Sequence, residues 1–169
     1  MGAPTSLAEG QTLDGKYVLH RVLGEGGMGI VWAARHRVLG TELAIKVLLP
    51  DARDPQTVAR FHREARASVR ITSIHAARVH DVAELDDGTP YMVMELLRGQ
   101  DLGQMLASSG PLPPHLAIDY VSQALVALEE AHAIGLVHRD IKPSNLYLAT
   151  QPNGTSILKV LDFGIARDF

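Results

Sequence analysis

The stretch that decides the fold is VHRDIKPSNLYL, residues 137–148, a short polar loop that leads into an apolar run. Its polar and charged side chains include those of His138, Arg139, Asp140, Lys142 and Asn145. A carboxylate in such a loop can orient a hydroxyl and accept its proton, and an amide oxygen can ligate Mg²⁺. The stretch therefore predicts a polar reaction site that directly follows a helix.

A second acidic motif, LDFG, occupies residues 161–164. It places Asp162 between an apolar run and a glycine, 17 residues after Asn145. An isolated aspartate before Phe-Gly is most often part of a turn. The motif points to a functional site only because it follows the other motifs in order along the chain.

Gly24, Gly26 and Gly29 of GEGGMGIV, residues 24–31, form a G-x-G-x-x-G pattern. This pattern indicates a loop that can approach a phosphate, since glycine has no Cβ to obstruct the backbone amides. A dinucleotide-binding fingerprint would need a helix that starts at the third glycine. Here Ile30, Val31 and Trp32 favour a strand instead. The stretch therefore predicts a hairpin that covers a phosphate group.

Two ionisable residues between these motifs each allow two interpretations. Lys46 lies in the apolar stretch ELAIKVLL, and Glu64 lies in a helical pattern. Taken alone, each is an ordinary solvent-facing residue of an edge strand or a helix. The alternative is that Lys46 binds phosphate oxygens and Glu64 holds its ammonium group in place.

Apolar periodicity and turn residues predict an α+β chain with a sheet-rich first part and a helical second part. We expect a flexible tail over 1–15, a small lobe over 16–97 and the start of a large lobe over 98–169. The expected strands are 17–23, 30–35, 42–48, 79–85, 91–95, 145–148 and 157–161. The expected helices are 57–71, 102–107 with Asp101 as its cap, and 116–134, with Ala117, Val121, Ala124, Leu125, Leu128 and Ala131 on the buried stripe.

Together, GEGGMGIVW, LAIK, HRDIKPSN and DFGIAR resemble the protein kinase family, from about residue 17 to residue 168. The chain looks most like the eukaryotic-like serine/threonine kinases of bacteria, and Lys142 matches the serine/threonine form of the loop. The resemblance implies a bilobal kinase-like fold with a complete small antiparallel-sheet lobe and one helix. It also implies transfer of the γ-phosphoryl group of ATP to serine or threonine hydroxyls of a protein substrate.

The resemblance also implies a role for each matching residue. Lys46 would bind the α- and β-phosphates while paired to Glu64, Asp140 would act as the catalytic base, and Lys142 would steady the transferred group. Asn145 and Asp162 would hold Mg²⁺. The residues implied to contact ATP are Leu23, Gly24, Glu25, Gly26, Gly27, Met28, Gly29, Val31, Ala44, Lys46, Met94, Glu95, Leu97, Asp101, Asn145 and Asp162.

Composition excludes several other classes of protein. A net charge of −3 provides no basic field for nucleic acid. The absence of cysteine excludes a disulfide framework and a thiolate metal site. The same absence suits a reducing compartment, so we expect a cytoplasmic location. Arg, Asp, Glu or His interrupts every apolar run, which argues against a membrane segment in this chain.

The family usually has an activation loop and an A-P-E motif after the glycine of DFG, and these residues are not present here. We therefore expect a kinase domain that is truncated soon after this motif. Its exposed large-lobe face would be covered by a partner or by the missing segment. Two functions remain open: an active serine/threonine kinase, or a fragment that binds nucleotide or a partner without turnover.

Overall fold

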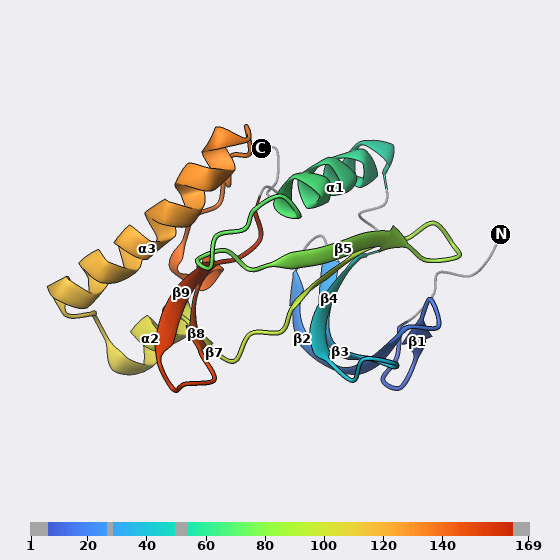
Figure 1. Cartoon of the computed structure of the whole chain (residues 1–169), viewed down its shortest axis with the longest axis horizontal. Coiled ribbons are helices and arrows are strands. Elements are labelled where there is room, and N and C mark those ends of the chain that lie inside the picture. The colour runs from blue at the N-terminus through green and yellow to red at the C-terminus, as the bar shows by residue number, and fades with distance from the viewer. Residues whose placement is uncertain (1–6, 27–28, 50–53, 164–169) are drawn as a thin grey trace. The chain divides into compact units, whose positions relative to one another are not determined.

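The computed structural model describes residues 7–26, 29–49 and 54–163. These residues divide into two compact units, one within 1–66 and 79–96 and the other within 67–78 and 97–169. Figure 1 shows the elements of both units. No helix in the described part of the chain is long and apolar enough to cross a membrane.

The first unit is built on an antiparallel six-stranded sheet. Across the sheet the order is β1 (Thr12–Leu13), β2 (Tyr17–Gly26), β3 (Gly29–His36), β4 (Glu42–Leu48), β6 (Pro90–Glu95) and β5 (Val79–Glu84). Alternate residues of a strand point to opposite faces. On one face Leu19, Trp32, Ile45 and Val93 pack into a core with Tyr91. The opposite face of β4 carries Ala44 and Lys46.

Helix α1 (Pro55–Ser68) follows β4 and has a clear start signal. Asp54 caps its start, because its Oδ1 accepts hydrogen bonds from the amides of Gln56 and Thr57 at 3.1 and 3.0 Å. The helix was expected to reach residue 71 but ends at Ser68. Two tight turns replace the last helical turn and direct Ile71 into the core of the second unit.

The second unit combines a small antiparallel sheet with two helices and a short 3₁₀ turn. Its elements are β7 (Gly99–Asp101), α2 (Leu102–Ser109), α3 (Pro114–Ala133), η2 (Pro143–Asn145), β8 (Leu146–Thr150) and β9 (Ser156–Val160). The predicted cap of α2 is present, since the Asp101 carboxylate accepts from the Gln104 amide at 2.9 Å. Helix α3 packs against β9, and Ala124, Ala127 and Ala131 face the core.

Three further expectations are wrong in detail. Thr12–Leu13 lie in the predicted tail but form β1, and Leu13 is buried; residues 1–6 lie outside the described part. Residues 67–78 were assigned to the small lobe but belong to the second unit, where Ile71 and Ala76 are buried.

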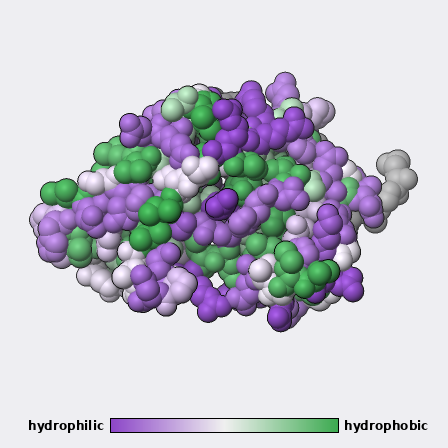
Figure 2. Space-filling view, viewed as in Figure 1, coloured by the Kyte–Doolittle hydropathy of each residue, from purple (hydrophilic) through white to green (hydrophobic). Residues whose placement is uncertain are grey.

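The third concerns the face of α3 that is buried. Val121 and Leu125 were expected on the buried stripe but are exposed, because the small alanines rather than these larger residues allow α3 to approach β9 closely. Apolar side chains of α3 are therefore exposed, and separate apolar patches lie among polar surface in this part of Figure 2.

Candidate active site

The buried side chain of His138, which is 1% exposed, anchors the polar loop after α3. Its Nδ1 accepts from the Asp140 amide at 3.2 Å, so Nε2 carries the proton and donates to the carbonyl of Leu161 at 2.6 Å. Its ring also meets that of Phe163 edge-on, with centroids 5.2 Å apart. The imidazole thus ties the loop to the residues that follow β9.

Three polar side chains of this loop meet at one carboxylate oxygen. Asp140 Oδ2 lies 2.8 Å from the Nζ of Lys142 and accepts from Nδ2 of Asn145 at 3.0 Å. The same Nδ2 also donates to the Asp140 carbonyl at 2.8 Å. The Lys142 hydrogen bond, followed by that of Asn145, lowers the pKa of Asp140 below its ordinary value and opposes the effect of desolvation. Asp140 is therefore held as a carboxylate at neutral pH.

The β8–β9 hairpin brings Asn145 and Asp162 to the same end. Leu146 pairs with Val160, and the amide of Leu161 donates to the Asn145 carbonyl at 2.9 Å. Asp162 is the next residue, and its backbone φ is 54°. Arg139 also has a positive φ, of 64°. Non-glycine residues adopt this conformation at a cost, and such residues cluster at functional sites as well as in turns.

In the first unit, strand register aligns the other predicted residues. Gly24 pairs with Val31, and Val31 pairs with Lys46, so the three residues lie in one row across β2, β3 and β4. Ala44, two residues before Lys46 in β4, pairs with Met94. Because residues two apart share a face of a strand, Ala44 and Lys46 face the same side of the sheet.

Lys46 and Glu64 are both buried, with 9% and 5% of their surface exposed. The solvent-facing interpretation that the sequence left open is therefore wrong for both. Buried charged groups in proteins are generally paired, because an isolated charge is costly to remove from water. The two residues belong to β4 and α1 of the same unit.

The described glycines of the hairpin differ in whether their surroundings require glycine. A Cβ on Gly29 would lie 2.7 Å from the carbonyl oxygen of Val47, so packing against β4 requires glycine there. A Cβ on Gly24 or Gly26 would meet nothing within 4 Å, and neither residue has a positive φ. Contacts within the described chain therefore do not explain these two glycines.

The remaining predicted residues are distributed over both units. Leu23 and Glu25 are exposed on β2, Glu95 ends β6, and Leu97 and Asp101 belong to the second unit. Gly27 and Met28 lie outside the described residues. The structure thus assembles one group of predicted residues on the sheet of the first unit and another around the polar loop of the second.

Sequence reasoning missed two polar residues that organise the second unit from α3. Gln123 Oε1 accepts from the Leu158 amide of β9 at 2.8 Å, and Glu130 accepts three hydrogen bonds from Thr72 and Ser73. These bonds lower the pKa of Glu130, that from the Thr72 amide most strongly. The seven-residue spacing of Gln123 and Glu130 puts both on one helical face. That spacing is the only sequence signal for them.

Comparison with known proteins agrees with this arrangement. A protein kinase domain model matches residues 17–169. The serine/threonine-protein kinase Pkn3 of Myxococcus xanthus is 42% identical over 159 residues, which cover 94% of this chain and 29% of that protein. The serine/threonine-protein kinase PknA of Mycobacterium tuberculosis is 42% identical over 163 residues, which cover 94% of this chain and 37% of that protein.

The fold is also similar to solved structures. The crystal structure of the Mycobacterium tuberculosis PknI kinase domain matches with a TM-score of 0.83 and 36% identity, over 96% of this chain and 64% of that one. The chain thus spans less than two fifths of the length of the two curated relatives. The expected α+β, kinase-like fold is confirmed, and the chain belongs to the protein kinase family.

Proposed function

We propose that this protein is a serine/threonine protein kinase that transfers the γ-phosphoryl group of ATP to protein hydroxyl groups in the presence of Mg²⁺. The observation that carries the proposal is the cluster in which Lys142 and Asn145 hold one oxygen of Asp140. Phosphoryl transfer depends mainly on positioning and on neutralising charge, and these side chains offer both.

Asp140 has the free oxygen that a catalytic base needs. Lys142 and Asn145 engage Oδ2, while Oδ1 has no hydrogen bond to the described residues. Oδ1 can therefore accept the proton of a serine or threonine hydroxyl as its oxygen bonds to the γ-phosphorus. The bond from that phosphorus to the β–γ bridging oxygen breaks, and ADP leaves. Lys142 would stabilise the charge on the transferred group.

The donor set fits Mg²⁺. Because Asn145 directs its Nδ2 at Asp140, its Oδ1 is left without a partner among the described residues. Those residues contain no cluster of three or more His, Asp or Glu side chains suited to a metal. Mg²⁺ usually takes one or two protein oxygens and completes its shell with phosphates and water. Asn145 and Asp162 would hold this ion, which neutralises phosphate charge when bound.

The aligned residues Gly24, Val31 and Lys46 of the sheet suit a nucleotide. The unexplained glycines Gly24 and Gly26 would let the backbone approach phosphate oxygens closely. Lys46 would bind the phosphates in a pair with Glu64. The residues proposed to enclose or hydrogen-bond the adenine and ribose are Leu23, Val31, Ala44, Met94, Glu95, Leu97 and Asp101.

The test compares radiolabel transfer from ATP to a serine- and threonine-rich protein for two matched variants. Asp140→Asn should lower the rate by about 10²–10⁴, since it removes the base but keeps the shape. Asp86→Asn makes the same chemical change at an exposed turn residue of the first unit and should leave the rate unchanged. Equal rates for wild type and Asp140→Asn would refute the proposal. Nucleotide binding without transfer in the wild type would favour the non-catalytic alternative.

A further inference from the structure

Glu130, near the end of α3, makes three hydrogen bonds that the proposed mechanism does not use. Its Oε1 accepts from the amide and the hydroxyl of Thr72, at 2.9 and 2.8 Å. Its Oε2 accepts from the amide of Ser73 at 2.7 Å. Hydrogen bonds to a carboxylate are short and strong compared with neutral ones. Glu130 therefore fixes the backbone at residues 72–73, more than fifty residues away in the sequence.

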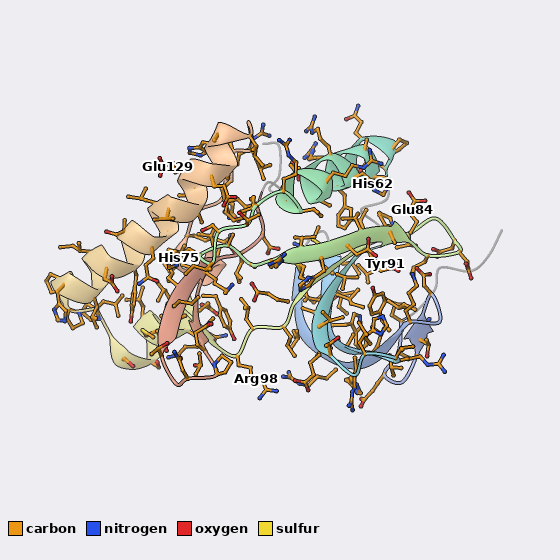
Figure 3. The ribbon with its side chains drawn as sticks, viewed as in Figure 1. His62, His75, Glu84, Tyr91, Arg98 and Glu129 are labelled. Carbon is orange, nitrogen blue, oxygen red and sulfur yellow. The ribbon has the colours of Figure 1, made fainter. Side chains whose placement is uncertain are left out.

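The segment that Glu130 fixes is in turn bonded to β9. The Val160 amide donates to the His75 carbonyl at 2.8 Å, and the Ala77 amide donates to the Val160 carbonyl at 2.9 Å. His75, labelled in Figure 3, donates from Nδ1 to the Leu158 carbonyl at 2.9 Å, because a carbonyl can only accept. Residues 75–77 thus lie parallel to the end of β9.

Strand β9 ends two residues before Asp162, and the residue between them is held from two sides. The Leu161 amide donates to the Asn145 carbonyl at 2.9 Å. The Leu161 carbonyl accepts from Nε2 of His138 at 2.6 Å. A continuous series of hydrogen bonds therefore runs from Glu130 through residues 72–77 and β9 to Asn145, within one compact unit.

We propose that Glu130 is a positioning residue for phosphoryl transfer, acting through residues 72–77 and β9 on Asn145 and Asp162. The inference rests on the proposed function, because it assigns these two residues to Mg²⁺. Misplacement of reacting groups by about 1 Å can lower a rate about a hundredfold. A contiguous series of contacts shows a route, and coupling is demonstrated when a variant at one end alters the other.

The chain offers a matched pair of variants. Glu130→Gln keeps the side-chain shape but replaces one acceptor oxygen with an NH₂ group, which cannot accept from Ser73 or Thr72. Glu129→Gln makes the same change one residue earlier, where the side chain is exposed and has no hydrogen bond or ion pair with the described residues (Figure 3). The comparison separates the loss of this anchor from the loss of one negative charge on α3.

The experiment measures three quantities on the full protein. They are the kcat for a protein substrate, the Mg²⁺ concentration that gives half-maximal rate, and hydrogen exchange at the amides of Thr72, Ser73 and Val160. For Glu130→Gln we expect a kcat at least about tenfold lower, a severalfold higher Mg²⁺ requirement and faster exchange at all three amides. A purely structural role would speed exchange and leave the Mg²⁺ requirement unchanged. Glu129→Gln should match the wild type throughout.

Wild-type kcat and Mg²⁺ dependence in Glu130→Gln would overturn the inference, whether or not exchange is faster. Should Glu130→Gln fail to fold, Thr72→Val decides, since it keeps the side-chain shape and removes only the hydroxyl bond to Oε1. It should shift the Mg²⁺ requirement in the same direction by a smaller factor, and no shift would overturn the inference. Failure of the proposed function looks different, because the wild type itself would then transfer no phosphate.

Discussion

The ionisable residues of the two units are held in opposite ways. In the first unit, Lys46 and Glu64 are buried within a regular strand and a regular helix. In the second unit, Asp140 and Asp162 lie in irregular segments with partly or largely exposed side chains, and Arg139 and Asp162 have a positive φ. Regular secondary structure carries the first pair, whereas the second pair lies in irregular segments, where hydrogen bonds hold Asp140 and the residue before Asp162.

The same contrast appears in the buried polar rings of the two cores. Trp32 of the first unit is 6% exposed, and its indole N–H has no hydrogen-bond partner among the described residues. His138 of the second unit is 1% exposed, and both ring nitrogens are bonded. The first core thus depends on packing of the ring, and the second depends on its hydrogen bonds. Matched substitutions by phenylalanine can test this difference.

The largest effect on stability is expected for His138→Phe. The change keeps an aromatic ring but leaves the Leu161 carbonyl and the Asp140 amide without their partner. An unsatisfied buried polar group costs about 1–3 kcal/mol, so we expect the free energy of unfolding to fall by about 2–4 kcal/mol. Denaturant unfolding measures it. A loss below about 1 kcal/mol would show that packing, not hydrogen bonding, holds the polar loop.

An intermediate effect is expected for Glu130 and depends on pH. Hydrogen bonds from Thr72 hold the pKa of Glu130 below its ordinary value of 4.5. A carboxyl group whose pKa is lowered by folding stabilises the folded state fully when the pH is above the ordinary pKa. This contribution disappears as the pH falls through the lowered pKa. Wild type should therefore exceed Glu130→Gln by about 1–2 kcal/mol at pH 7 and by less at pH 3.

Unfolding curves of the two proteins across this pH range test the sign, with Glu129→Gln as control. A stability gap that stays constant or widens toward low pH would contradict the role of the ionised carboxylate. A similar gap for Glu129→Gln would assign the effect to net charge on α3 rather than to the bonds with Thr72 and Ser73.

The smallest effect is expected for Trp32→Phe. The smaller ring loses packing against Ile45 and its neighbours, but the change also removes a buried N–H that has no partner. These contributions oppose each other, so the free energy of unfolding should change by less than about 1 kcal/mol. A loss as large as that of His138→Phe would remove the contrast between the two cores.

A separate contact links two elements of the first unit. His62 of α1 and Glu84 of β5 approach to 2.9 Å (Figure 3). The distance suits an ion pair when His62 is protonated. Such a half-exposed pair contributes little to stability. The position of α1 therefore depends mainly on buried residues such as Phe61 and Ala65.

The sequence allowed most of the fold to be predicted, because the longer strands and helices have clear periodicity and turn residues at their ends. It did not predict β1 and β7, since strands of two and three residues are too short for a periodic pattern. The prediction of the buried face of α3 was wrong because hydrophobicity alone favoured Val121 and Leu125 over Ala127, which is buried.

The residues of the candidate site also fall into those that the sequence predicted and those that it did not. Motifs identified Asp140, Lys142 and Asn145, which are close in the sequence and meet in the structure. The burial of Lys46 and Glu64 could not be inferred from their own stretches, because it depends on how strands and helix pack. Glu130 was missed because it bonds to a backbone segment that is distant in the sequence.

The central claim is that Lys46 binds the phosphates of the nucleotide and that Asp140 of the polar loop is the base for the transfer. Calorimetric titration with Mg·ATP, run beside the phosphotransfer assay, tests it on Lys46→Met and Asp140→Asn. We predict that Lys46→Met weakens binding at least about tenfold, whereas Asp140→Asn binds like the wild type and transfers almost no phosphate. Transfer by Asp140→Asn at the wild-type rate would contradict the account.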